Sequence, residues 1–87
     1  MASVNDTIAA IATPPGKGGI GIVRISGPDA SRIGKEISKK ETEARVATFV
    51  SFYDSRNRPI DQGLLIRFKG PQSFTGEDLV ELQGHGG

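Results

Sequence analysis

The sequence has no cysteine, no tryptophan and a single histidine. The absence of cysteine excludes a disulfide, and one imidazole without a thiol is too few ligands for a structural zinc site. Apolar packing alone must therefore stabilise the core of this 87-residue chain. A domain of this size buries only about 60 to 65% of its unfolded surface, so we expect further burial against a partner subunit or further chain.

An excess of one charge and a long hydrophobic run are also missing. Eleven Lys and Arg residues face ten Asp and Glu residues, and this net charge of +1 does not predict nonspecific binding to nucleic acid or anionic membranes. The longest apolar runs, such as residues 8–12, are far shorter than the about 20 residues of a membrane span. The first residues lack the features of a signal peptide, which favours a cytoplasmic protein without membrane association.

Turn-forming residues, by contrast, are abundant, with 12 glycines and 5 prolines. Short apolar and β-branched runs lie between them and are typical of strands. The predicted strands cover residues 7–13, 21–26, 45–53, 62–68 and 78–83. The polar residues 54–59 join the third strand to the fourth and predict an antiparallel hairpin with a somewhat long loop.

One helix is predicted after Ser26. The segment 26–29 supplies a capping residue, a proline suited to the first turn and an acid near the positive end of the helix dipole. Ala30, Ile33 and Ile37 then recur at helical spacing, which predicts an amphipathic helix on a sheet. The fold class is therefore α+β, with a small mixed or antiparallel sheet and one main helix. Because domains seldom stop in glycines directly after a strand, we expect the domain of residues 1–87 to be incomplete at its C-terminus.

A glycine-rich segment, Gly16 to Gly21, matches the G-x-G-x-x-G pattern of dinucleotide-binding and kinase loops. The dinucleotide pattern requires a helix after the glycines, whereas residues 22–25 read as a strand, and the other kinase motifs are missing. We interpret the segment as a turn between strands. A phosphate-binding loop that contacts an anion through Lys17 and backbone amides is the alternative.

Two charged residues, Arg24 and Glu81, lie between apolar neighbours inside predicted strands. Each is compatible with a polar outer face of the sheet, and strand alternation places Gln83 on the same face as Glu81. On neighbouring strands, the guanidinium and the carboxylate could pair with each other. They could also hold a planar polar heterocycle, because a carboxylate accepts two parallel N–H groups.

The remaining polar motifs predict no catalytic and no metal-binding residue. His85 lies among glycines without a second imidazole or a serine in a G-x-S-x-G context, so neither metal nor triad chemistry is favoured. The segment 73–78 is typical of a turn that caps its own amides. Nothing specific supports general acid or base work by Glu77, Asp78 or Glu81.

Four longer motifs occur in a fixed order and together resemble one known family. They are residues 5–8 (NDTI), 12–19 (ATPPGKGG), 23–27 (VRISG) and 73–87 (SFTGEDLVELQGHGG). These motifs are similar to those of the N-terminal domain of the MnmE/TrmE family of tRNA-modifying GTPases. The match covers essentially the whole chain and is less distinctive between residues 35 and 58.

The resemblance implies a domain related to the folate-binding part of the glycine-cleavage aminomethyltransferases. Such a domain forms a homodimer and binds 5-formyl-tetrahydrofolate or another one-carbon tetrahydrofolate. The family's folate contacts fall on Arg24 and Glu81, and a third contact, a lysine, lies C-terminal to the residues present.

The resemblance also implies a parent protein that hydrolyses GTP with Mg²⁺ and K⁺, at sites outside these residues. With the FAD-dependent partner MnmG/GidA, that parent forms carboxymethylaminomethyl or aminomethyl uridine at the wobble position of tRNA. Two other functions stay open for the chain itself. One is a dimerisation module without ligand, whose charged strand residues form intersubunit ion pairs, and the other is the phosphate-binding loop.

Overall fold

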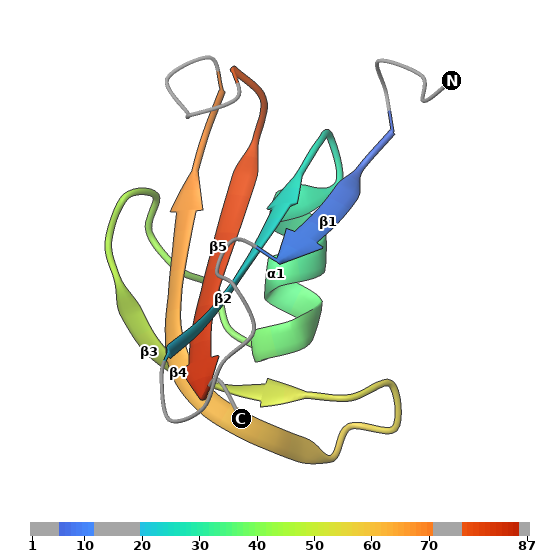
Figure 1. Cartoon of the computed structure of the whole chain (residues 1–87), viewed down its shortest axis with the longest axis vertical. Coiled ribbons are helices and arrows are strands. Elements are labelled where there is room, and N and C mark those ends of the chain that lie inside the picture. Colours follow the sequence, from blue (N-terminus) through green and yellow to red (C-terminus); the bar gives the residue numbers. More distant parts are fainter. Residues whose placement is uncertain (1–5, 12–19, 71–75, 86–87) are drawn as a thin grey trace.

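The structure is a computed structural model and describes residues 6–11, 20–70 and 76–85. In these residues a sheet of five strands carries one helix. The elements are β1 (Ile8–Ile11), β2 (Ile20–Ser26), α1 (Ala30–Ser38), β3 (Thr48–Tyr53), β4 (Pro59–Phe68) and β5 (Leu79–His85). The strands lie in the order β1-β2-β5-β4-β3, and each neighbouring pair is antiparallel (Figure 1). The predicted α+β class is confirmed, with an antiparallel sheet.

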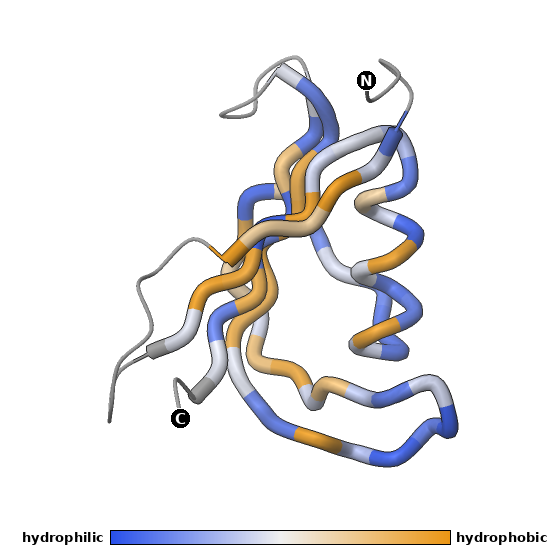
Figure 2. The backbone as a smooth tube through the Cα atoms, turned by 45° about the vertical axis from the view of Figure 1, so that its right-hand side comes forward, coloured by the Kyte–Doolittle hydropathy of each residue, from blue (hydrophilic) through white to orange (hydrophobic). Residues whose placement is uncertain are grey.

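The helix covers one face of the sheet (Figure 2). Strand alternation turns apolar side chains of β2, β3, β4 and β5 toward α1, where they form a single core. The buried members of this core are Ile25, Ala30, Val50, Phe52, Leu65 and Val80, and Val23, Ile33, Ile37 and Leu82 pack partly buried against them. The predicted amphipathic face of the helix is therefore confirmed.

The start of α1 differs from the prediction. The helix begins at Ala30, with Asp29 as an N-cap whose side chain makes no capping hydrogen bond. Ser26 does not cap the helix, because it is still paired with Leu79 in the β2–β5 ladder. Instead, the Asp29 backbone N–H donates to the hydroxyl of Thr7 at 3.0 Å, so the residue before β1 supplies the acceptor. Pro28 consequently lies before the helix rather than in its first turn.

The third strand starts later than predicted, at Thr48 instead of residue 45. Arg45 has a φ of 67°, a left-handed conformation that interrupts extended backbone. The predicted hairpin is confirmed between β3 and β4. Asp54 fixes its turn, since its carboxylate accepts the backbone N–H groups of Arg56 and Arg58. These hydrogen bonds lower the pKa of Asp54. The largest effect comes from the backbone N–H of Arg58, and the backbone N–H of Arg56 and the side chain of Arg58 add smaller effects.

The close approach of β4 to β5 depends on Gly63. A Cβ at this position would lie 1.9 Å from the backbone carbonyl oxygen of Gln83, so the two strands would have to separate. We predict that Gly63→Ala lowers the free energy of unfolding by about 2 to 3 kcal/mol, as overpacking of a core does. Urea denaturation measures this loss.

Gly84→Ala is the matched control, because its added Cβ would meet the Asp61 carboxylate at 2.7 Å, which is a side chain that can rotate away. The free energy of unfolding should fall clearly less in Gly84→Ala than in Gly63→Ala. Equal losses in the two variants would show that the backbone approach at Gly63 is not the constraint.

Candidate functional site

The sheet face turned away from α1 carries both charged residues that the sequence singled out. Arg24 on β2 and Glu81 on β5 are direct partners in the antiparallel ladder. Direct partners of such a ladder project to the same face, so the two side chains lie next to each other. The sequence predicted two separate strand positions, and the fold brings them together.

The two side chains form an ion pair. The Arg24 Nε donates to Glu81 Oε1 at 2.9 Å, with 42% of the Arg24 side chain and 13% of the Glu81 side chain exposed. The carboxylate is therefore the more deeply placed partner, and the guanidinium lies closer to solvent. Direct pairing was one of the arrangements that the sequence left open, and it is the one that the structure contains.

A third polar side chain, Gln83, completes the cluster. Its Nε2 donates to Glu81 Oε2 at 2.7 Å, so each carboxylate oxygen receives one hydrogen bond from a side chain. Strand alternation alone predicts Gln83 on the face of Glu81 but indicates no role for it. The signal was present in the alternation of β5, because residues two apart on a strand are neighbours on one face.

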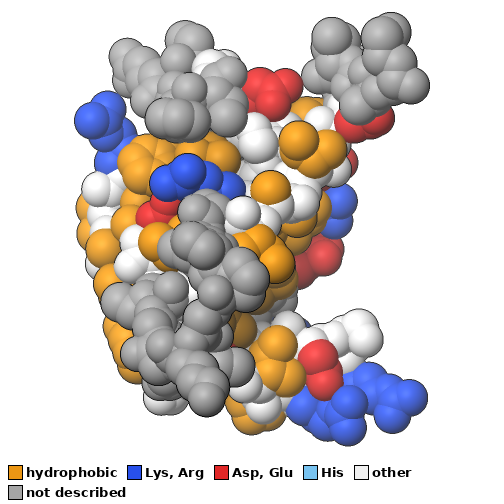
Figure 3. Space-filling model, in the orientation of Figure 1, with side chains coloured by type: hydrophobic (Ala, Val, Ile, Leu, Met, Phe, Trp, Pro, Cys, Tyr) orange, Lys and Arg blue, Asp and Glu red, His pale blue; other side chains and the backbone are white. Residues whose placement is uncertain are grey.

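Apolar residues surround this polar cluster, which we call the Arg24–Glu81–Gln83 cluster. The strand registers place Ala10 beside Arg24 and Ile66 beside Glu81. They likewise place Ile22 and Leu64 on either side of Gln83. Phe49, the partner of Leu64 on β3, is 62% exposed on the same face. Arg24, Glu81 and Gln83 thus lie on the outer face of the sheet, but their neighbours in the strand registers are largely apolar. In Figure 3, charged side chains lie among hydrophobic ones on the face in view.

The turn residues near the cluster have structural roles. The Ser26 hydroxyl donates to Glu77 Oε2 at 3.1 Å, and Asp78 Oδ1 accepts the Gly70 backbone N–H at 3.0 Å. The predicted capping of amides within segment 73–78 stays a prediction, because residues 73–75 lie outside the described residues. Lys17 and most of the glycine-rich segment also lie outside them. Among the residues that are described, no group of acids, histidine or cysteine is placed to hold a metal ion.

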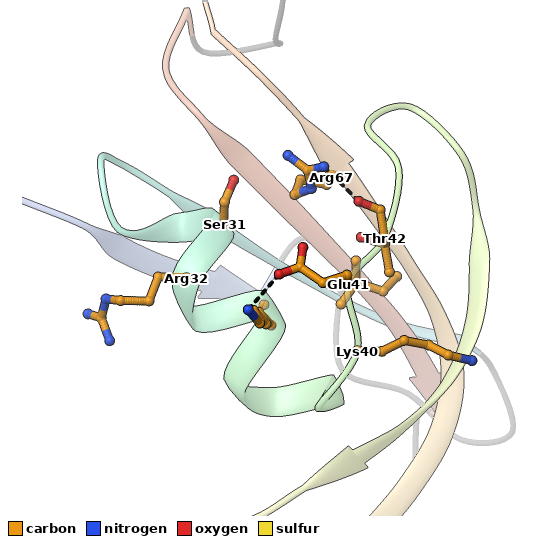
Figure 4. A pocket seen from close by; sticks show the side chains of 9 residues that line it. Ser31, Arg32, Lys40, Glu41, Thr42 and Arg67 are labelled. Carbon is orange, nitrogen blue, oxygen red and sulfur yellow. Dashed lines mark hydrogen bonds and ion pairs between the residues drawn. The ribbon is translucent and has the colours of Figure 1, made fainter.

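A separate hollow of about 290 Å³ lies between α1 and the segment that follows it. In Figure 4, the side chains of Ser31, Glu41 and Arg67 point into this hollow, whereas Arg32 and Lys40 point away. Arg67 donates to the Thr42 carbonyl oxygen at 2.6 Å, and Lys35 pairs with Glu41. These contacts fasten the segment to the helix and to β4. The hollow is on the helix-covered side, so the sheet separates it from the Arg24–Glu81–Gln83 cluster.

The ion pair in this hollow changes the acidity of Glu41. The hydrogen bond from Lys35 and the charge of its ammonium group lower the pKa of Glu41, and the Arg67 guanidinium adds a smaller effect in the same direction. Because the pKa of Glu41 is lower in the folded state, the ion pair stabilises the fold at pH values above the ordinary pKa of the carboxyl group. This contribution is lost as the pH falls through the folded-state value.

The fold and the site together define a small antiparallel α+β domain that carries a charged cluster on the sheet face opposite α1. Residues 7–87 match the model of the family described as "GTP-binding protein TrmE N-terminus", and the chain belongs to this family.

Curated relatives support this assignment. The chain is 56% identical to the tRNA modification GTPase MnmE of Pseudomonas paraeruginosa over 87 residues, which is all of the chain and 19% of that protein. It is 58% identical to the tRNA modification GTPase MnmE of Legionella pneumophila strain Corby over 82 residues, or 93% of the chain and 18% of that protein. The chain thus spans about a fifth of the length of the relatives it matches. No helix in the described part of the chain is long and apolar enough to cross a membrane.

The Lys35–Glu41 pair leads to a prediction about titration. In Lys35→Gln, the carboxyl group of Glu41 should titrate at a higher pH than in the unmodified chain, because the largest cause of its lowered pKa is removed. Arg67→Gln should give a smaller shift in the same direction. Carbon-13 NMR of the side-chain carboxyl groups during a pH titration measures both shifts, with Asp54 as the internal control. An unmoved Glu41 in Lys35→Gln would contradict the assigned cause.

Proposed function

We propose that this chain is the tetrahydrofolate-binding and homodimerisation domain of a tRNA-modifying GTPase. Membership of the TrmE N-terminus family and the names of the curated relatives support the parent class. The resemblance of the motifs to the MnmE/TrmE family, which implies a domain related to the folate-binding part of the glycine-cleavage aminomethyltransferases, supports the ligand. The observation that carries the proposal is the ion pair of Arg24 and Glu81 in the middle of an apolar sheet face.

The stability of the fold does not explain this ion pair. An ion pair whose carboxylate is withdrawn from water adds little net stability, because the cost of desolvation offsets the Coulomb attraction. Glu81 has 13% of its side chain exposed and faces Ile66 on the neighbouring strand. Apolar residues at these two positions would satisfy a sheet equally well. Charged groups in such a setting are candidates for ligand recognition.

The chemistry of the cluster fits a reduced pterin. The pterin edge carries an amino group and a ring N–H side by side, and a carboxylate such as Glu81 can accept both. The Arg24 guanidinium can donate to the ring carbonyl, the one-carbon group or the glutamate tail of 5-formyl-tetrahydrofolate. The apolar side chains around the cluster offer a surface for the flat ring. In this proposal the domain binds and orients the carbon donor, which is its part of catalysis.

Homodimerisation is the second part of the proposal. Several large apolar side chains are exposed in the described residues, among them Ile8, Ile11 and Phe49. A chain of 87 residues with a thin core gains stability when such surface is buried against a second copy. The same observation favours the alternative of a dimerisation module without ligand.

The parent protein's activity lies beyond these residues. We propose that it hydrolyses GTP with Mg²⁺ and K⁺ in the cytoplasm. It works with the FAD-dependent partner MnmG/GidA and forms carboxymethylaminomethyl or aminomethyl uridine at the wobble position of tRNA. No residue of this chain is assigned a catalytic role in GTP hydrolysis.

Calorimetric titration of the full-length protein with 5-formyl-tetrahydrofolate tests the ligand. Arg24→Ala and Glu81→Ala should each weaken binding by about 10- to 100-fold, because a hydrogen bond to a charged group contributes about 1.5 to 3 kcal/mol. Both variants should remain folded without ligand, with some loss of thermal stability in Arg24→Ala, which leaves the Glu81 carboxylate without its charged partner. Arg32→Ala and Glu36→Ala are the matched controls, since these residues form an exposed ion pair at 3.0 Å on α1. Unchanged affinity in both site variants would remove the folate assignment.

Thermal unfolding at several protein concentrations separates the ligand-free alternative from the proposal. A folate-binding dimer should gain stability both from added 5-formyl-tetrahydrofolate and from higher protein concentration. A dimerisation module without ligand should respond to protein concentration alone. A response to nucleotide but not to folate would instead favour the phosphate-binding loop.

A further inference from the structure

Gln83 is the member of the cluster to which neither the family resemblance nor the ion pair gives a role. It lies two residues after Glu81 on β5 and projects to the same face. Its Nε2 donates to Glu81 Oε2 at 2.7 Å, whereas Arg24 donates to Oε1. The two hydrogen bonds therefore reach the carboxylate on its two different oxygens.

The orientation of the Gln83 amide follows from the chemistry of its partner. An ionised carboxylate only accepts hydrogen bonds, so the NH₂ group of the amide must face Glu81. The opposite orientation would bring the amide oxygen against a carboxylate oxygen. The amide carbonyl is thus left as an acceptor that Glu81 does not use.

Two donors on two oxygens fix the plane of a carboxylate. The terminal torsion of a glutamate side chain is broad, so a carboxylate held by one hydrogen bond still rotates about its last bond. With Arg24 on one oxygen and Gln83 on the other, this rotation is restricted before any ligand arrives. Binding to a prearranged group costs less conformational entropy and is tighter.

The fold itself does not require an amide at position 83. The ladder partners of Gln83 are Ile22 on β2 and Leu64 on β4, and both are apolar. The ladder is held by backbone hydrogen bonds, and an apolar side chain would pack as well between these neighbours. The polar residue is therefore explained by the group that it touches, which is the Glu81 carboxylate.

We propose that Gln83 is a positioning residue of the pterin site, which holds the Glu81 carboxylate in the plane that accepts the two parallel N–H groups of a reduced pterin. This inference rests on the proposed function. It assigns Gln83 an effect that acts through Glu81, and it predicts that the effect disappears when Glu81 is absent.

Titration of the full-length protein with 5-formyl-tetrahydrofolate tests the role. Gln83→Leu should weaken binding about 5- to 20-fold, less than the loss of Glu81 itself, because it frees the carboxylate to rotate without removing it. Gln83→Met, which keeps the length of the side chain without the amide, should behave alike and serves if the leucine variant unfolds. Gln62→Leu is the matched control on β4, where Gln62 is exposed and pairs with Ser51. Its affinity should not change.

A double-mutant cycle distinguishes positioning from a structural effect. In the Glu81→Ala background, Gln83→Leu should change the affinity by less than about twofold, because the group that it positions is gone. Equal effects of Gln83→Leu in both backgrounds would overturn the inference. So would unchanged affinity in Gln83→Leu and Gln83→Met while Glu81→Ala weakens binding, although the proposed function would then stand. Unchanged affinity in Glu81→Ala and Arg24→Ala would overturn the proposed function and this inference together.

Discussion

The pairing of β2 with β5 is the constraint on which the rest of the molecule depends. This ladder joins the N-terminal strands to the C-terminal strand through seven residue pairs, from Ile20–His85 to Ser26–Leu79. One register places Ile25 and Val80 under the helix and Arg24 opposite Glu81 on the other face. Because strand side chains alternate, a slip of either strand by one residue would turn its core residues outward and its charged residue under the helix. The register between β2 and β5 therefore determines both the core and the Arg24–Glu81–Gln83 cluster.

The two faces of the sheet differ in what covers them and in the side chains that they carry. The face under α1 is filled by the domain's own apolar residues, and Gly34 brings the helix so close that an added Cβ would lie 3.1 Å from a methyl group of Val80. The other face is also largely apolar, yet it carries the Arg24–Glu81–Gln83 cluster and exposed side chains such as Phe49. A sheet with one solvated face normally alternates apolar and polar residues. This face departs from that pattern, and an apolar surface with a charged cluster is typical of a face that binds a ligand or a second protein.

Local signals in the sequence were sufficient for much of this architecture. The helical spacing of Ala30, Ile33 and Ile37 and the polar segment between β3 and β4 led to correct elements, because both depend on neighbouring residues. Predictions failed where a distant group intervened. The sequence predicts a helix cap at residues 26–29, but Ser26 stays paired with β5 in the ladder, and Thr7 supplies the acceptor instead. The left-handed conformation of Arg45, which delays β3, has no signal in residue type.

Composition, periodicity and ordered motifs are properties of the chain alone, and they were enough to predict the α+β class, the family and the two charged strand residues. The folded sheet was needed to show that Arg24 and Glu81 are direct partners, that Gln83 donates to the second carboxylate oxygen and that the ladder neighbours of all three are apolar. These facts depend on register between strands more than 50 residues apart. Such register is set by the packing of the whole sheet on its helix, and no local pattern of residues encodes it.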